Sequence, residues 1–453
     1  MKSVLIANRG EIACRIIRSC RRLRLRSIAV HSEADRSALH VTMADAAVEI
    51  GPAAARDSYL RVDRLLDAAQ SSAADAVHPG YGFLSENAEF AEAVGAAGLL
   101  WIGPAAQAIR DMGDKQRARD LAQASGLPVL PGSGRFETSD LTGIEAAGED
   151  VGYPLLIKAA AGGGGIGMRR VDRPEQLRGM AEATQSMAAK AFGDGSIYLE
   201  RCIERARHVE IQVFGFGNGE AIHLHERDCS IQRRFQKVIE ESPAPGIPQA
   251  LRAEMAQAAV RLCRDQRYAG AGTIEFVVDA DTLAYFFLEM NTRIQVEHPV
   301  TEMRTGRDLV AMQIEQARGT LAVVDQHSVE AQGHAIECRI YAENPAKNFM
   351  PSPGRLVRFE VPDPTPDVRI DSGFRTGDDV TFFYDPMIAK VICRGPTRDA
   401  AIALTLDTLQ AIRIEGPVTN LAFLRATIAH PSFKAGEVFT GFVERFKPAL
   451  LSP

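Results

Sequence analysis

Residues 286–299 have the sequence Phe286-Phe287-Leu288-Glu289-Met290-Asn291-Thr292-Arg293-Ile294-Gln295-Val296-Glu297-His298-Pro299, which begins as a hydrophobic strand and ends in charged and amide groups. Residues two apart in a strand share a face, so Glu289 and Asn291 point together, and Arg293 follows if the extended form continues. An α/β protein commonly presents its chemistry where a hydrophobic strand turns polar at its end. The segment therefore predicts an α/β fold with a functional site here.

The strand before this segment strengthens the prediction. Residues 273–278 have strand character and residues 279–282 are turn formers, so a hairpin brings Glu275 roughly opposite Glu289. Two facing carboxylates repel, and one must take up a proton unless a divalent cation lies between them. The Asn291 oxygen is a further candidate ligand, and Mg²⁺ leaves its other positions to water and phosphates. The pattern favours a nucleotide–metal site over a solvated hairpin end with unrelated acids.

Length and composition set wider bounds. A chain of 453 residues predicts about three domains. Its 46% hydrophobic and 24% charged residues are typical of a globular protein, and a net charge of −6 argues against a nucleic-acid partner. The basic run at residues 21–26 is interpreted as a solvated or subunit-contacting face at the end of a helix.

The sequence also carries expectations about location. No segment is apolar enough to span a membrane, so no membrane partner is expected. The first strand begins almost at Met1, which predicts the absence of a targeting peptide. Seven dispersed cysteines without a Cys-x-x-Cys pair indicate reduced thiols, and we expect a cytoplasmic protein.

The first 113 residues alternate strands and helices. Strands are predicted at 4–7, 27–31, 76–78 and 99–103, with helices around 12–20, 59–69 and 88–97 between them. This is the rhythm of a doubly wound parallel sheet. The first turn, Asn8–Glu11, lacks the Gly-x-Gly-x-x-Gly pattern, so we expect a Rossmann-like domain without a nicotinamide cofactor.

Phosphate-binding features follow. A buried strand ends at Lys158 and runs into a loop with glycines at 162–165 and 167. Consecutive glycines let backbone N–H groups approach anionic oxygens, although such a loop can also be a plain linker. A later strand, residues 197–200, continues into Arg201–Ile203 and is a candidate edge against an adenine.

The next segments concentrate polar groups. A half-buried strand at 208–214 carries His208, Glu210 and Gln212 on one face. The charge-rich stretch 226–237 is predicted to be a loop that lines the site. His223 and His225 are interpreted as ordinary strand histidines, because no third nitrogen or sulfur ligand lies near them in sequence.

Nearly the whole chain resembles biotin carboxylase, an ATP-grasp enzyme of the biotin-dependent carboxylases. The resemblance rests on eight short runs in matching order, Ile6–Ala13, His78–Asn87, Met112–Lys115, Arg207–Gln212, Glu226–Lys237, Glu289–Glu302, Ala335–Ile340 and Pro351–Gly354. It implies a multidomain α/β and α+β protein. The implied units are a Rossmann-like domain at 1–113, an ATP-grasp domain at 114–330 with a mobile lid at about 131–203, and a mixed C-terminal domain at 331–453.

The resemblance also implies residue roles. The residues implied to bind ATP are Lys115, Lys158, Gly164, Gly165, Glu200, Arg201, Ile203, His208, Gln232, Glu275 and Glu289. Those implied to bind Mg²⁺ or Mn²⁺ are Glu275, Glu289 and Asn291. Those implied to hold bicarbonate are Lys237, Arg293, Gln295, Val296 and Glu297, with Glu297 as general base. Arg339 is implied to stabilise the biotin enolate, and Tyr81 to line the biotin side.

The chemistry requires these residue types. Bicarbonate must be deprotonated and phosphorylated before it can carboxylate, which needs a carboxylate base, an arginine clamp, and metal and lysine charges on the transferred phosphoryl group. The family usually has a lysine or arginine in the glycine loop where this chain has Ile166. It also usually has a polar residue, His or Asn, where this chain has Phe235. Two alternatives therefore stay open, a nucleotide-binding regulatory subunit and an ATP-grasp ligase with another carboxyl acceptor.

Partners complete the expectation. The sequence contains no Ala-Met-Lys-Met-like biotinylation hairpin, so we expect biotin on a separate biotin carboxyl carrier protein and a separate carboxyltransferase subunit. Acetyl-CoA, with a role in fatty acid biosynthesis, is the default final acceptor, while propionyl-CoA and pyruvate stay possible. The resemblance also implies a homodimer.

Overall fold

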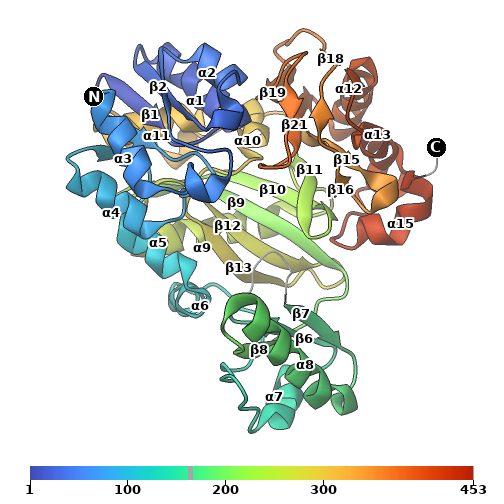
Figure 1. The fold of residues 1–453 in the computed structure, drawn as a ribbon. Coiled ribbons are helices and arrows are strands. Elements are labelled where there is room, and N and C mark those ends of the chain that lie inside the picture. Colours follow the sequence, from blue (N-terminus) through green and yellow to red (C-terminus); the bar gives the residue numbers. More distant parts are fainter. Residues whose placement is uncertain (162–166, 452–453) are drawn as a thin grey trace.

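The fold is described from a computed structural model, which covers residues 1–161 and 167–451. Residues 1–113 form a parallel five-stranded sheet in the order β3-β2-β1-β4-β5, flanked by helices (Figure 1). The strands are β1 Ser3–Ile6, β2 Arg26–His31, β3 Ala46–Glu49, β4 Ala76–His78 and β5 Leu100–Trp101. The helices are α1 Gly10–Arg22, α2 Leu39–Met43, α3 Val62–Ser71, α4 Ala88–Ala96 and α5 Ala106–Gly113. The predicted doubly wound sheet is confirmed, and it gains β3 as an edge strand.

Helix α1 shows why this part folds as it does. Ile12, Ile16 and Ile17 recur at helical spacing and are fully buried against β1 and against helix α11 (Leu309–Arg318). The helix begins at Gly10, whose φ of +62° turns the chain directly from the end of β1. The start of α1 is thereby fixed at the carboxyl edge of the parallel sheet.

A smaller unit projects from the body at the bottom of Figure 1. It contains an antiparallel sheet in the order β7-β6-β8, packed against helices α7 and α8. Its elements are α7 Ile144–Val151, β6 Leu155–Ala159, β7 Met168–Val171, α8 Pro174–Phe192 and β8 Ile197–Arg201, and helix α6 Lys115–Ala124 precedes it. The predicted strand at 197–200 is therefore an edge of its sheet. The prediction of a phosphate-binding loop falls largely on residues 162–166, outside the described residues.

The body is built on one antiparallel eight-stranded sheet in the order β13-β12-β9-β10-β11-β14-β21-β19. Its strands are β9 Ala206–Phe216, β10 Ala221–Arg233, β11 Gln236–Ser242, β12 Ala269–Asp279, β13 Tyr285–Asn291, β14 His334–Tyr341, β19 Val368–Ser372 and β21 Met387–Gly395. Helices α9 Gln249–Asp265, α10 His298–Thr305 and α11 connect or cover these strands. Strands from both sides of the predicted boundary at 330 thus share one sheet.

The rest of the C-terminal part closes the fold. Its helices are α12 Arg398–Ala411, α13 Leu421–Ala429, α14 Pro431–Lys434 and α15 Phe442–Leu451. Its short strands are β15 Glu343–Asn344, β16 Met350–Pro351, β17 Gly354–Arg355, β18 Arg358–Glu360, β20 Asp379–Val380 and β22 Arg413–Glu415. These helices bury an apolar cluster against β14 and β21. Among the described residues, no helix combines the length and apolar character needed to cross a membrane.

The charge-rich stretch 226–237 differs from its prediction. It forms most of β10, a two-residue turn and the start of β11, rather than a loop. Arg234 and Phe235 make the turn with φ of +52° and +63°. The charges are compatible with a central strand because they pair across it: the fully buried Arg227 guanidinium lies 2.6 Å from Glu210 on β9.

Candidate active site

A cavity of about 710 Å³ lies where the N-terminal part, the projecting unit and the eight-stranded sheet meet. Its walls include the start of α1, the loop around Tyr81, and the polar ends of β9, β12 and β13. Ligand sites prefer such clefts between structural units. The predicted residues that line it are Tyr81, Lys115, Lys158, Glu200, His208, Gln232, Lys237, Glu275, Glu289, Asn291, Arg293, Gln295, Val296, Glu297 and Arg339.

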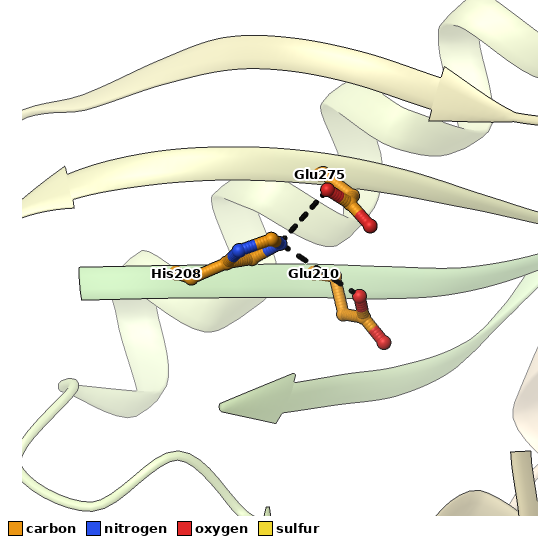
Figure 2. Close-up of side chains that lie close together, drawn as sticks. All are labelled: His208, Glu210 and Glu275. Carbon is orange, nitrogen blue, oxygen red and sulfur yellow. Dashed lines mark ion pairs between the residues drawn. The ribbon is translucent and has the colours of Figure 1, made fainter. Parts of the chain in front are cut away.

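Lys237 is the centre of an ionic cluster on the cavity wall. Its Nζ lies 2.6 Å from Glu210 Oε2 and 2.7 Å from both Glu275 Oε1 and Glu297 Oε1. Figure 2 shows His208 and Glu210 from β9 beside Glu275 from β12, with His208 Nε2 2.9 Å from Glu275 Oε2. Because three carboxylates converge on one ammonium group, Lys237 already supplies a cation at their meeting point.

The β12–β13 hairpin has the predicted register. Glu275 pairs directly with Glu289, and a bulge follows between Glu275 and Phe276. Although burial raises the pKa of Glu275, the charges of Lys237 and His208 outweigh it and hold that pKa well below its usual range. Glu289 faces the open cleft, yet the surrounding walls and the Glu275 charge raise its pKa. Of the two facing acids, Glu289 is therefore the one that holds a proton more readily.

These residues fit a hard divalent cation. Glu275 and Glu289 are in cross-strand register, and burial and the charge of Glu275 raise the pKa of Glu289. Two such facing carboxylates form a donor set suited to Mg²⁺ or Mn²⁺. Asn291 is arranged differently from the prediction, because its Nδ2 donates to Glu275 Oε1 while its Oδ1 accepts from Arg293. Turning the amide by half a rotation would present its oxygen to the two acids.

The segment 293–297 joins the hairpin to α10. Arg293 donates from NH2 to Asn291 Oδ1 (2.9 Å), from NH1 to Gln295 Oε1 (2.8 Å) and from Nε to Glu86 Oε2 (2.9 Å). Gln295 Nε2 in turn donates to Glu275 Oε1 at 3.1 Å. The guanidinium and amide groups are thus fixed side by side at the cavity wall, as needed to bind a small oxyanion.

Glu297 is the one acid of residues 293–297, and cations surround its carboxylate. It is fully buried, and its carboxylate lies between Lys237 and Arg339, whose NH2 donates to Oε2 at 2.9 Å. Burial alone would raise its pKa, but the charges of Lys237, Arg339 and Arg227 hold the pKa of Glu297 well below its usual range. The carboxylate is therefore ionised at neutral pH.

The cavity wall toward the projecting unit is cationic. Lys158 forms an ion pair with Glu200 across β6 and β8, and Arg119 NH1 lies 3.5 Å from the other oxygen of Glu200. Lys115 lines the same region, where burial lowers its pKa. Positive groups at the meeting of the projecting unit and the body suit the phosphates of a nucleotide.

Two residues expected at an adenine lie elsewhere. Arg201 Nε donates to the Val151 carbonyl at 2.8 Å, so its side chain turns away from the cavity, and half-buried Ile203 does not line the cavity. Gln232 lies 3.0 Å from His208 Nδ1 at the wall. Gly164, Gly165 and Ile166 fall outside the described residues.

The cavity wall also contains the two residues predicted for biotin. The Tyr81 hydroxyl donates to Glu11 Oε2 at 2.6 Å, and Arg339 projects from β14 toward Glu297. The Asn8 side chain holds the main chain around Tyr81, because its Nδ2 donates to the Pro79 and Tyr81 carbonyls at 2.7 Å. The wall therefore combines an aromatic surface with a fixed cation.

Several residues that hold the site in place were not predicted from the sequence. Four such residues are Glu11, Glu86, Arg227 and Lys390. The first three pair with side chains named in the prediction. Lys390 instead holds the main chain, since its Nζ donates to the Val296 carbonyl at 2.7 Å. Lys390 does carry a recognisable pattern, because it is a single lysine inside the apolar run 387–393. A lysine in a central strand needs buried partners, which makes it a candidate for a structural or functional ion pair.

Family models match three consecutive parts of the chain. Residues 1–109 match the model "Biotin carboxylase, N-terminal domain" and residues 337–445 match "Biotin carboxylase C-terminal domain". Residues 114–322 match "Carbamoyl-phosphate synthase L chain, ATP binding domain".

Curated relatives cover the full length of the chain. Biotin carboxylase 1 of Bacillus subtilis is 49% identical over 446 residues, which are 98% of this chain and 99% of that protein. The mitochondrial methylcrotonoyl-CoA carboxylase subunit alpha of Rattus norvegicus is 48% identical over 448 residues. The chain spans only 62% of that subunit, and 61–64% of three similar subunits from other organisms.

Solved structures agree with the sequence comparison. Biotin carboxylase from Campylobacter jejuni, in a complex described as β-γ-ATP, is 41% identical with a TM-score of 0.93, covering 98% of both chains. The biotin carboxylase domain dimer of Hydrogenobacter thermophilus 2-oxoglutarate carboxylase, solved with MgADP, ADP and bicarbonate, is 40% identical with a TM-score of 0.93, covering 100% of this chain and 99% of that one. The expected organisation is confirmed, with an N-terminal parallel sheet, an ATP-grasp domain and a C-terminal domain. This chain belongs to the biotin carboxylase family.

Proposed function

We propose that this chain catalyses the ATP- and bicarbonate-dependent carboxylation of biotin through carboxyphosphate. The observation that carries the proposal is Glu297, a fully buried carboxylate ionised by Lys237 and Arg339 on the wall of the main cavity. An ionised carboxylate can accept a proton, and the fixed cations beside it can hold the anion that gives the proton. Membership of the biotin carboxylase family supports the same reaction.

The proposed first step activates bicarbonate. Lys237, Arg293, Gln295 and the Val296 main chain bind the anion, and Glu297 accepts the proton of its hydroxyl group. A bicarbonate oxygen then bonds to the γ-phosphorus of ATP while the bond to ADP breaks, which gives carboxyphosphate and ADP.

The nucleotide side of the proposal uses the cationic wall. Lys115, Lys158, Gly164 and Gly165 hold the phosphates, while the residues assigned to the ribose and adenine are Glu200, His208 and Gln232. Arg201 and Ile203 follow Glu200 along the chain, but their side chains do not line the cavity. Glu275, Glu289 and Asn291 hold Mg²⁺ or Mn²⁺, which neutralises phosphate charge when bound. The solved relative with MgADP supports this assignment.

The proposed second step transfers the carboxyl group. Carboxyphosphate breaks into CO₂ and phosphate, and the released phosphate accepts the proton of the biotin ureido nitrogen. That nitrogen then bonds to the carbon of CO₂. Arg339 stabilises the enolate-like oxygen of biotin, and Tyr81 lines that side. Enclosure by the projecting unit protects carboxyphosphate from water.

Partners and setting belong to the same proposal. We assign biotin to a carrier protein, the second half-reaction to a carboxyltransferase, and the assembly to a homodimer in the cytoplasm. The relatives named above include carboxylases for methylcrotonoyl-CoA and 2-oxoglutarate, so acetyl-CoA and fatty acid biosynthesis stay one prediction among several for the final acceptor.

The test is bicarbonate-dependent release of phosphate from ATP in the presence of free biotin. Glu297→Gln removes the base and is expected to lower kcat by about 10²–10⁴-fold, the usual contribution of general base catalysis. Glu302→Gln is the matched control, because Glu302 is also a buried, ion-paired glutamate nearby but does not line the cavity. Phosphate release that is equal in wild type and Glu297→Gln would exclude the proposal, and turnover indifferent to biotin would favour another acceptor.

A further inference from the structure

Two glutamates without a role in the proposed reaction lie next to its base. Glu240 on β11 and Glu337 on β14 are direct cross-strand partners, so their side chains share one face of the sheet. Both are fully buried. None of their four carboxylate oxygens accepts a hydrogen bond of acceptable geometry from the described residues. Two carboxylates cannot both ionise at such a position without a large cost in free energy.

The pair interacts with the two cations that hold the Val296–Glu297 segment, Arg339 with Glu240 and Lys390 with Glu337. Arg339 and Lys390 are themselves cross-strand partners on β14 and β21, on the same face as Glu337. Arg339 NH2 lies 2.7 Å from Glu240 Oε1 and 2.9 Å from Glu297 Oε2, so one nitrogen is within ion-pair distance of both acids.

The surrounding charges are too few to ionise every acid. Besides Arg339 and Lys390, the charged groups that face the pair are Lys237 from β11 and Glu297 from the start of α10. Lys237 is already shared by three carboxylates, and Lys390 lies 3.1 Å from Glu11. Burial also raises the pKa of the nearby thiols Cys229 and Cys338 well above its usual range, so they stay neutral.

We propose that Glu240 and Glu337 share a single proton at neutral pH, and that this proton positions Arg339 between Glu240 and Glu297. The inference rests on the proposed function only for its kinetic consequence. Burial raises the pKa of Glu337 well above its usual range; the charge of Lys390 lowers this pKa, and the charge of Glu240 raises it. Burial likewise raises the pKa of Glu240. Both glutamates are positioning residues, because they act through Arg339.

The consequence is a built-in alkaline limit. When the shared proton is lost at high pH, the pair carries two negative charges, which attract Arg339 and repel the Glu297 carboxylate. Arg339 then moves its hydrogen bond from Glu297 to the pair, and carboxylation slows. The proton itself leaves to solvent and takes no part in the chemistry.

The direct test is infrared spectroscopy of the full chain between neutral and alkaline pH. Wild type is expected to show a protonated carboxyl band from this pair that disappears on alkaline titration. Both Glu240→Gln and Glu337→Gln should lose this band, because the remaining carboxyl ionises. Glu241→Gln should keep it, since Glu241 is the adjacent buried glutamate of β11 but pairs with His334 and Arg398. An identical band in wild type and both single variants would overturn the proposal.

Kinetics supply the second readout. Each single glutamine variant keeps one negative charge, so kcat at neutral pH should stay within about threefold, while the alkaline decline of kcat should move up by about one pH unit or more. The double variant removes the charge and should lose at least about tenfold at every pH. An unmoved alkaline limb in Glu337→Gln contradicts the proposal. If one variant fails to fold, the infrared spectra of wild type and of the other variant still test the shared proton. The infrared test also works if wild type cleaves no ATP, so failure of the proposed function and failure of this proposal are distinguishable.

Discussion

At the scale of single residues, ionisation rather than residue type separates the acids of the cavity. Glu275 and Glu297 share Lys237 and have a pKa well below the usual range. Glu289 forms no ion pair within the part of the chain that the structure describes, and burial raises its pKa. Sequence spacing predicted which acids meet, but not their charges. Those depend on Lys237 and Arg339, which reach the site from other strands.

Phe235 permits a prediction about nucleotide affinity. Its side chain is 67% exposed and lines the cavity, so a histidine of smaller volume fits there and can donate a hydrogen bond to the nucleotide. A net hydrogen bond of about 0.5–1.5 kcal/mol predicts that Phe235→His lowers the KM for ATP by about 2–10-fold with kcat unchanged. Phe382→His is the control, since Phe382 is 76% exposed and does not line the cavity. Equal KM values in the two variants would contradict this prediction.

His40 predicts acid sensitivity of the fold. It is fully buried on α2 and lies 3.2 Å from the Val30 carbonyl; burial lowers its pKa to about 4. In the unfolded state the histidine pKa is about 6.5, so the unfolded state binds the proton more tightly than the folded state does. The stability that neutral His40 contributes above pH 6.5 is therefore lost as the pH falls toward 4. The expected slope from this residue is about 1 kcal/mol per pH unit.

The measurement is the free energy of unfolding in urea between pH 7 and pH 4. His40→Gln should flatten its decline, because glutamine keeps a donor for Val30 and cannot titrate. His327→Gln, a change at an exposed histidine, should leave the profile as in wild type. A slope that His40→Gln does not reduce would show that other groups dominate acid unfolding.

At the scale of elements, local patterns predicted strands well and charged strands poorly. The β12–β13 hairpin has the predicted register because alternation and turn residues are local properties. The stretch 226–237 was predicted wrongly as a loop, since its charges are neutralised by residues far away in sequence, such as Glu210 and Glu343. A charge run signals solvent only when no partner strand supplies the opposite charge.

Gly215 tests how closely the central strands pack. A Cβ at this position of β9 would lie 2.1 Å from the Tyr268 carbonyl oxygen, which is backbone and cannot turn aside. Gly215→Ala should therefore lower the free energy of unfolding by about 1–3 kcal/mol or more, measured by urea denaturation. Gly179→Ala on α8 meets no atom within 4 Å and should be neutral or stabilising by up to about 1 kcal/mol. Equal effects of the two changes would contradict the packing described here.

At the scale of the whole molecule, distant parts of the chain meet at the Val296–Glu297 segment. Glu11 comes from α1, Arg339 and Lys390 from the C-terminal strands, and all contact that segment or its anchors. The resemblance to biotin carboxylase covered nearly the whole chain, so it predicted that these distant parts belong to one enzyme. The physical link between them could not be predicted, because Lys390 lies 94 residues from its partner Val296.

Lys390 therefore supports a prediction at this scale. Lys390→Met removes the donor to Val296 and leaves Glu11 buried beside a neutral side chain, so the free energy of unfolding should fall by about 3–5 kcal/mol. kcat for bicarbonate-dependent ATP cleavage should fall as well, because the segment that carries Glu297 loses its anchor. Lys447→Met, at a lysine that pairs at 3.6 Å with the largely exposed Glu444, should change stability by less than about 0.5 kcal/mol.

A double variant separates the two effects of this change. Glu11→Gln combined with Lys390→Met removes the uncompensated carboxylate, so urea denaturation should show that much of the lost stability returns. The Val296 carbonyl still lacks its donor in the double variant, so kcat should stay low. Recovery of both stability and kcat would mean that Lys390 serves only to neutralise Glu11, and recovery of neither would mean that Lys390 acts through its packing in β21. Stability restored without activity is the outcome expected if one lysine holds the N-terminal and C-terminal parts of the molecule to the base.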